Sequence, residues 1–165
     1  MKNLKQYTNI YIVAATLLLL PSVLLSKNEV PEAQPYVNKR IVIVQSTKDY
    51  TAANKTAVKV AKQLQISLKL RGLTPHPKTG LTYSSKECAK GGFDHPCYIS
   101  RGRYDDGDYV SIEHSDAFQG FSKGYYIVVT ASGNEKDIAV SLANAKKHYK
   151  DAYAKLTKIY IGCIH

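Results

Sequence analysis

The sequence of 165 residues contains no tryptophan, one methionine and three cysteines, and its 13 acidic residues are outnumbered by 23 Lys and Arg residues. It also lacks a Gly-x-Ser-x-Gly elbow, a His-Glu-x-x-His helix, a phosphate-binding glycine loop and a dinucleotide fingerprint, so these enzyme and cofactor signatures are excluded. The formal net charge of +10 favours anionic partners. Lysines on solvated helix faces also serve solubility, and that interpretation of the charge stays open.

The N-terminal segment has the pattern of an export signal. Two lysines precede an apolar stretch over residues 10–25, which is slightly shorter than the roughly 17 to 25 residues that span a bilayer. A cleaved signal peptide and a retained inner-membrane anchor over residues 1–26 therefore both remain open. Residues 27–39 contain prolines without periodicity and are interpreted as a linker to a single domain over residues 40–165. We expect a periplasmic or secreted protein, so envelope polymers are favoured over nucleic acid as partners.

Within the predicted domain, a strand followed by a helix occurs twice. An apolar, β-branched run over residues 41–44 precedes a helical periodicity that reaches Leu70, and a second strand over residues 125–129 precedes one that reaches Leu156. A last strand is expected over residues 158–164. The pattern predicts an α/β (α+β) fold, with a ferredoxin-like βαβ-βαβ sheet and two helices on one face.

Residues 81–124 interrupt this repeat and are interpreted as an insertion. Two strand-like segments, 97–104 and 108–114, flank the sequence Asp-Asp-Gly at 105–107. Asp-Gly between such segments is a strong signal for a tight turn, so we expect a β-hairpin here.

The cysteine spacing in the insertion favours a disulfide. Cys88 and Cys97 bracket a short loop with two glycines and a proline, and such a loop closes easily in an oxidising compartment. Zinc at Cys88, His95 and Cys97, and calcium at the acidic turn, are the alternatives, although neither spacing is standard. We expect no metal and no cofactor, and the pairing of Cys163 stays open.

A cluster of aromatic and basic side chains supplies the candidate ligand site. Tyrosine rings can lie against sugar faces, and arginine side chains pair with carboxylates or phosphates. Tyrosines also favour strands, where alternation sends half of them into the core. The predicted ligand-binding residues are Tyr98, Arg101, Arg103, Tyr104, Tyr109, Glu113 and Tyr125.

Acidic and histidine side chains in the same region leave a hydrolase of envelope polymers open, because paired carboxylates suit glycoside cleavage. Glu113 and His114 are neighbours in a predicted strand, so they should point to opposite faces and make a poor acid–base pair. The turn aspartates suit local backbone hydrogen bonding. We therefore favour a binding protein over an enzyme. The residues considered are Asp94, His95, Asp105, Asp106, Asp108, Glu113, His114 and Asp116.

The second unit also carries a family resemblance. Its aromatic-led strand Tyr-Tyr-Ile-Val-Val, the turn Thr-Ala-Ser-Gly and the helix beginning near Ile138-Ala139 resemble the SPOR (sporulation-related repeat) domain, and the likeness covers about 41–70 and 125–164. That family has a ferredoxin-like arrangement and binds septal peptidoglycan glycan strands that lack stem peptides. The resemblance implies peptidoglycan, or another anionic envelope polymer, as the partner. The alternative function is an inhibitor or adaptor that binds an envelope protein through the hairpin.

Overall fold

The computed structural model describes residues 35–163, so the predicted signal or anchor segment lies outside the described residues. No helix in this part of the chain is long and apolar enough to cross a bilayer. The first strand begins inside the predicted linker, because its start pairs with the end of the last strand, Tyr36 opposite Tyr160. The elements are β1 (Tyr36–Thr47), α1 (Tyr50–Leu64), β2 (Thr74–His76), β3 (Gly80–Thr82), α2 (Ser85–Lys90), β4 (Gly107–His114), the 3-10 helix η1 (Ser115–Ala117), β5 (Tyr126–Gly133), α3 (Glu135–Lys146) and β6 (Tyr153–Tyr160).

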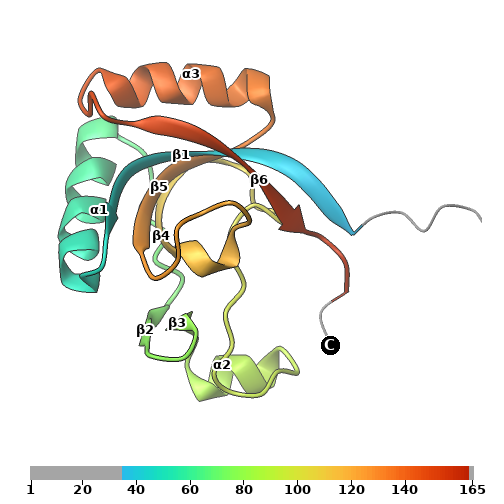
Figure 1. The fold of residues 1–165 in the computed structure, drawn as a ribbon. Helices are drawn as coiled ribbons and strands as arrows, with labels where there is room; N and C mark the ends of the chain where they lie inside the picture. The colour runs from blue at the N-terminus through green and yellow to red at the C-terminus, as the bar shows by residue number, and fades with distance from the viewer. Residues whose placement is uncertain (1–34, 164–165) are drawn as a thin grey trace, which may run out of the picture. The chain divides into compact units, whose positions relative to one another are not determined.

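The main sheet has four strands in the order β4-β5-β1-β6, and every neighbouring pair is antiparallel. With α1 between β1 and β4, and α3 between β5 and β6, the chain follows the β-α-β-β-α-β path of a ferredoxin-like fold. Figure 1 shows β2, β3 and α2 as a separate group of small elements beside this sheet. The predicted α+β class is therefore confirmed.

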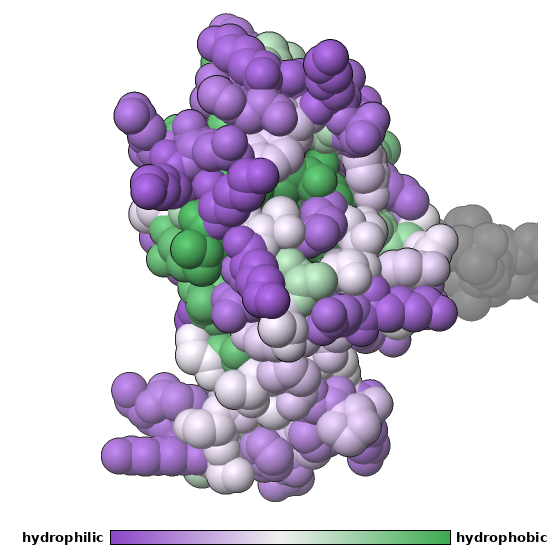
Figure 2. Space-filling view, turned by 90° about the vertical axis from the view of Figure 1, so that its left-hand side faces the viewer, coloured by the Kyte–Doolittle hydropathy of each residue, from purple (hydrophilic) through white to green (hydrophobic). Residues whose placement is uncertain are grey.

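Two helices cover one face of the sheet. Helix α1 is capped by Asp49, whose carboxylate accepts a hydrogen bond from the amide of Thr51, and the buried side chains of the helix recur at helical spacing. Helix α3 is capped in the same way by Asn134. The outer face of α1 is lysine-rich, and Figure 2 shows a largely hydrophilic surface on the side where α1 lies in Figure 1.

The centre of the sheet is buried on both faces, which is typical of a continuous β-branched run such as that in β1. Val42 packs toward α3, whereas Ile41 and Ile43 belong to a cluster on the opposite face. That opposite cluster is closed by Phe118, which follows η1, and by Ile159 of β6. The second face of the sheet is therefore covered by loops instead of helices.

The predicted insertion has different bounds. Strand β4 lies within 81–124 but is an edge strand of the main sheet, so the segment added to the basic fold runs from 65 to 106. Residues 97–104 form no strand, and the predicted hairpin with 108–114 is wrong. The backbone of β4 pairs with β5 on one side and, at Val110, with residues 67–69 on the other. A short hairpin does occur in the insertion, between β2 and β3.

Both helices end earlier than predicted. Helix α1 stops because Gln65 adopts a left-handed conformation with φ of 54°, so the apolar residues up to Leu70 continue as an extended segment beside β4. Ala152, which falls at helical spacing in the sequence, lies in a turn after α3 and packs against the helix from there. The apolar pattern therefore continues past the end of the helix. Leu156 then lies in β6 and is 52 % exposed.

Candidate functional site

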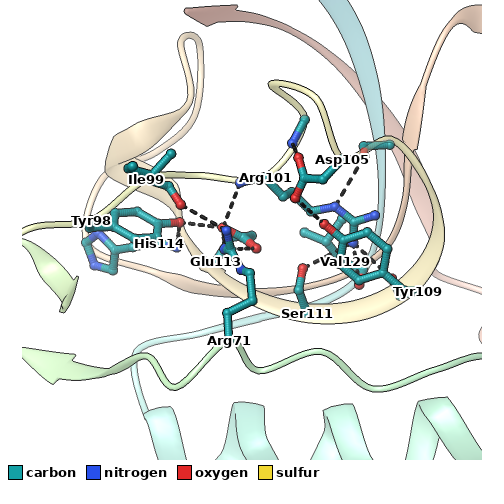
Figure 3. Close-up of polar contacts among 12 residues, drawn as sticks. Arg71, Tyr98, Ile99, Arg101, Asp105, Tyr109, Ser111, Glu113, His114 and Val129 are labelled. Carbon is teal, nitrogen blue, oxygen red and sulfur yellow. Dashed lines mark hydrogen bonds and ion pairs between the residues drawn. The ribbon is translucent and has the colours of Figure 1, made fainter. Parts of the chain in front are cut away.

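Residues 97–106 lie across the face of β4 that points away from α1, and they bring most of the predicted site residues together (Figure 3). On β4, Val110 and Ile112 pack against α1, while Tyr109, Ser111 and Glu113 point to the other side. Side chains therefore alternate between the two faces of this strand. Its polar face is covered by chain instead of solvent, so these three side chains are buried.

Arg101 is fully buried and makes hydrogen bonds to the sheet. Its Nη1 donates to the carbonyl of Tyr109 at 2.9 Å and to Oγ of Ser111 at 3.1 Å, and its Nη2 donates to the carbonyl of Gly107 at 3.0 Å. The register of β4 against β5 shifts between Asp108 and Ser111, so carbonyls near this bulge need other donors. The guanidinium supplies them, and it also lies 3.6 Å from the centroid of the Tyr109 ring.

Glu113 is a second buried hub in this network. Its carboxylate accepts two hydrogen bonds from Arg71 Nη2, at 2.6 and 2.7 Å, and one from the Tyr98 hydroxyl at 2.6 Å. It is 0 % exposed, and the backbone amide of Arg101 also donates to it at 3.3 Å. Arg71 reaches this position from a left-handed backbone conformation with φ of 58°, which costs a residue other than glycine about 1–2 kcal/mol.

Burial and pairing set the protonation of the network. Burial favours the neutral form of Arg71, but the Glu113 carboxylate together with Tyr83, Tyr98 and Tyr109 outweighs burial and holds the pKa of Arg71 above its ordinary value. Burial, together with the Glu113 carboxylate, raises the pKa of Tyr98 well above its ordinary value. Burial also lowers the pKa of Arg101. Tyr98 therefore acts as a hydrogen-bond donor over the physiological range.

Asp105 links this network to the surface. Its Oδ1 accepts from the amide of Gly102 at 2.7 Å, and its Oδ2 accepts from the Tyr109 hydroxyl at 2.6 Å. Partial burial favours the neutral acid, but these two hydrogen bonds, together with the charges of Arg71 and Arg101, outweigh burial and lower the pKa of Asp105. The other turn carboxylates bind elsewhere: Asp106 pairs with Lys39 at 2.6 Å, and Asp108 accepts from Ser141. Each of these carboxylates is thus bound by different partners, which is typical of aspartates in turns.

A pocket of about 490 Å³ opens over the surface end of the network. Its walls come from the disulfide-bearing part of the insertion and from the segment that covers β4. Aromatic rings and two guanidinium groups dominate its lining, which is typical of a pocket that holds an organic ligand by apolar contact and a few polar groups. The lining residues are Arg71, Tyr83, Phe93, Ile99, Ser100, Arg103, Tyr104 and Asp105.

Arg103 and Tyr104 stand at the open side of this pocket. Tyr104 is 81 % exposed, yet its hydroxyl donates to the carbonyl of Ile161 at 2.7 Å. Arg103 donates to the carbonyl of Gly162 at 2.5 Å. Both side chains are therefore tied to the segment after β6, and the exposed ring is held in one place.

A disulfide joins Cys88 and Cys97, as predicted, with an S–S distance of 2.11 Å. Cys88 is buried in α2, and the loop that the bond closes carries Phe93, a wall of the pocket. Because the two sulfurs are bonded to each other, they are not thiolate ligands for the zinc alternative. Cys163 is free and exposed, and no cluster of three metal-ligating residues occurs within 35–163.

The structure separates the predicted site residues into four groups. Arg101, Tyr109 and Glu113 were predicted to contact a ligand, but they are at most 3 % exposed and hold the fold together. Tyr125 lines another pocket, of about 220 Å³, together with Ser115 at the start of η1. Only Arg103 and Tyr104 of the predicted set line the pocket of about 490 Å³, whereas Tyr98 lines a neighbouring pocket of about 270 Å³.

Several pocket residues were missed by sequence reasoning. Arg71 falls in a segment predicted to end a helix, so nothing in the pattern sets its side chain apart. Tyr83 and Phe93 lie on either side of α2, and the disulfide was the available signal that these positions are brought near residue 99. Comparison with known proteins adds no relative: no family model, no curated protein and no solved structure matches this chain.

Proposed function

We propose that this protein is an exported binding protein of the cell envelope, and that it holds an anionic glycan in the pocket beside Tyr104. Peptidoglycan is the leading ligand. The observation that carries this proposal is an open pocket of about 490 Å³ whose walls combine aromatic rings with the guanidinium groups of Arg71 and Arg103.

The aromatic rings suit the apolar face of a sugar. Tyr83, Phe93 and Tyr104 line the same pocket. The ring of Tyr104 is exposed but fixed through its hydroxyl, so little side-chain entropy is lost when a ligand packs on it. A preorganised ring of this kind supports binding better than a mobile one.

The charge of the lining suits an acidic group. Two arginines and one aspartate face the pocket, and the aspartate is already engaged by Tyr109 and Gly102. Arg103 makes no ion pair among the described residues, so its guanidinium can pair with a ligand carboxylate. The net charge of +10 attracts such a ligand over a longer range at low salt.

The expected compartment agrees with this ligand. The N-terminal pattern of an export signal or anchor supports a location in the periplasm or outside the cell, and the disulfide suits an oxidising compartment. Peptidoglycan is an abundant anionic polymer in that location.

Sedimentation with purified peptidoglycan, before and after removal of stem peptides, tests the proposal. Wild-type protein is expected in the pellet, and Tyr104→Ala is expected to shift it to the supernatant. Tyr153→Ala is the matched control, because Tyr153 is also an exposed tyrosine, at 42 %, but does not line this pocket. No pelleting with either preparation would refute glycan binding, and soluble fragments released over time would show a hydrolase instead.

A protein partner is the second candidate, because tyrosine and arginine dominate binding hot spots and are clustered here. Tyr36, Tyr104 and Tyr160 are all exposed by at least 36 %, and Arg103 lies among them. If the protein is an adaptor, Arg103→Ala should abolish a complex with an envelope protein while sedimentation with glycan stays unchanged. A loss of sedimentation in that variant favours the glycan.

A further inference from the structure

A second pocket adjoins the first. It has a volume of about 270 Å³ and is lined in part by β1, β6 and the loop after η1. Ile99, Ser100 and Arg103 line both pockets, so the two hollows meet along the segment that covers β4. Any ligand that extends beyond the first pocket on this side meets the second.

Arg103 lies between the aromatic walls of the two pockets. Its guanidinium carbon is 5.7 Å from the ring centroid of Tyr104, in the first pocket, and 5.7 Å from that of Tyr160, in the second. The two rings are therefore separated by at most twice that distance, which a short oligosaccharide can bridge. Tyr36 extends the second wall, because its ring meets that of Tyr160 edge-on at 5.2 Å.

Three successive carbonyls hold this surface in place. Ile161 accepts from the Tyr104 hydroxyl at 2.7 Å, Gly162 accepts from Arg103 at 2.5 Å, and Cys163 accepts from the Tyr160 hydroxyl at 3.0 Å. One backbone strip thus fixes an aromatic ring in each pocket and the cation between them. Such fixation lowers the entropy that binding an extended ligand costs.

The second pocket offers polar groups that a sugar chain needs. Ser100, Gln119 and Lys158 line it together with Arg103. The hydroxyl and amide groups suit sugar hydroxyls and N-acetyl groups, and the ammonium group of Lys158 suits a further acidic substituent. The same pairing of rings with cations thus occurs on both sides of Arg103.

On the basis of the proposed function, we infer that the two pockets are subsites for one acidic oligosaccharide chain that crosses Arg103. A disaccharide occupies the first pocket only. A longer chain fills both pockets, and its second contact is intramolecular, so affinity rises with chain length.

Calorimetric titration with peptidoglycan glycans stripped of stem peptides, as a disaccharide and as an octasaccharide, tests this inference. The octasaccharide is expected to bind about 100-fold more tightly, the lower end of what linking two sites provides. Lys158→Ala is expected to weaken the octasaccharide but not the disaccharide, whereas Tyr104→Ala weakens both. Lys62→Ala, which removes an exposed lysine of α1, is the charge-matched control and should leave both constants unchanged.

The outcomes separate the two claims. Equal dissociation constants for the two lengths, or equal effects of Lys158→Ala on both, would overturn the two-subsite inference while leaving glycan binding in place. Failure of wild-type protein to bind either length would overturn the proposed function, and this inference with it.

Discussion

Replacing the buried Arg101 with methionine is expected to lower the free energy of unfolding by about 3–5 kcal/mol. The substitution removes the guanidinium N–H donors from a site that water does not reach, so their acceptors stay without a partner. The change strips a donor from the carbonyls of Gly107 and Tyr109 and from the hydroxyls of Ser111 and Ser132. A buried acceptor left without a donor costs about 1–3 kcal/mol. Two such carbonyls account for most of the expected loss, and relief of the buried charge offsets part of it.

Urea denaturation followed by circular dichroism measures this loss. Arg101→Lys is the informative second variant, because it keeps the charge but cannot span the same acceptors, and it should lose stability as well. Arg103→Met is the control, with an expected loss of about 1 kcal/mol for its single hydrogen bond to Gly162. An unfolding midpoint of Arg101→Met equal to that of wild type would refute the structural role assigned to this arginine.

Three further changes test other parts of the structure. Asp105→Asn should make the loss of stability at acid pH less steep. A carboxyl whose pKa is lowered in the folded state contributes stability above its unfolded pKa, near 3.8, and this stability is lost as pH falls through the folded pKa. An acid titration in which the variant loses stability as steeply as wild type would contradict this. Gly80→Ala should lower the free energy of unfolding, measured by thermal unfolding, by about 2–4 kcal/mol, because φ at Gly80 is 74° and a Cβ would lie 2.1 Å from an imidazole carbon. Gly92→Ala has a similar φ of 78° but open space around the Cβ, so it should lower the free energy of unfolding by only about 1–2 kcal/mol. Replacing Cys88 and Cys97 together by alanine should cost about 2–3 kcal/mol in urea, and equal midpoints with and without the bond would contradict a stabilising role.

The fold was largely predictable because its signals are local. The β-branched run at 41–44 indicates a strand that is buried on both faces. The spacing of Ala53, Ala57 and Val60 indicates a helix that packs one face against the sheet. The place of β4 was not predictable in this way, because pairing with β5 is a long-range choice between strands. The Asp-Gly sequence at 106–107 leads directly into β4 and does not join two paired strands.

The site was only half predictable, and the two arginines show why. Arg101 and Arg103 are two residues apart, so a strand would direct both to the same face. Instead, Gly102 adopts φ of 94° and its amide binds Asp105, so the chain turns between them. The first arginine enters the core and the second stays at the surface. Composition drew attention to the right segment but carries no information on this turn.

The pocket beside Tyr104 is proposed to bind an envelope glycan. Titration of wild type and Tyr104→Ala with peptidoglycan glycan tests it most directly, because Tyr104 is 81 % exposed and its loss should leave the fold intact. We expect a dissociation constant at least about tenfold weaker in the variant, equivalent to about 1.4 kcal/mol, with Tyr153→Ala unchanged. Equal dissociation constants for Tyr104→Ala and wild type would contradict it.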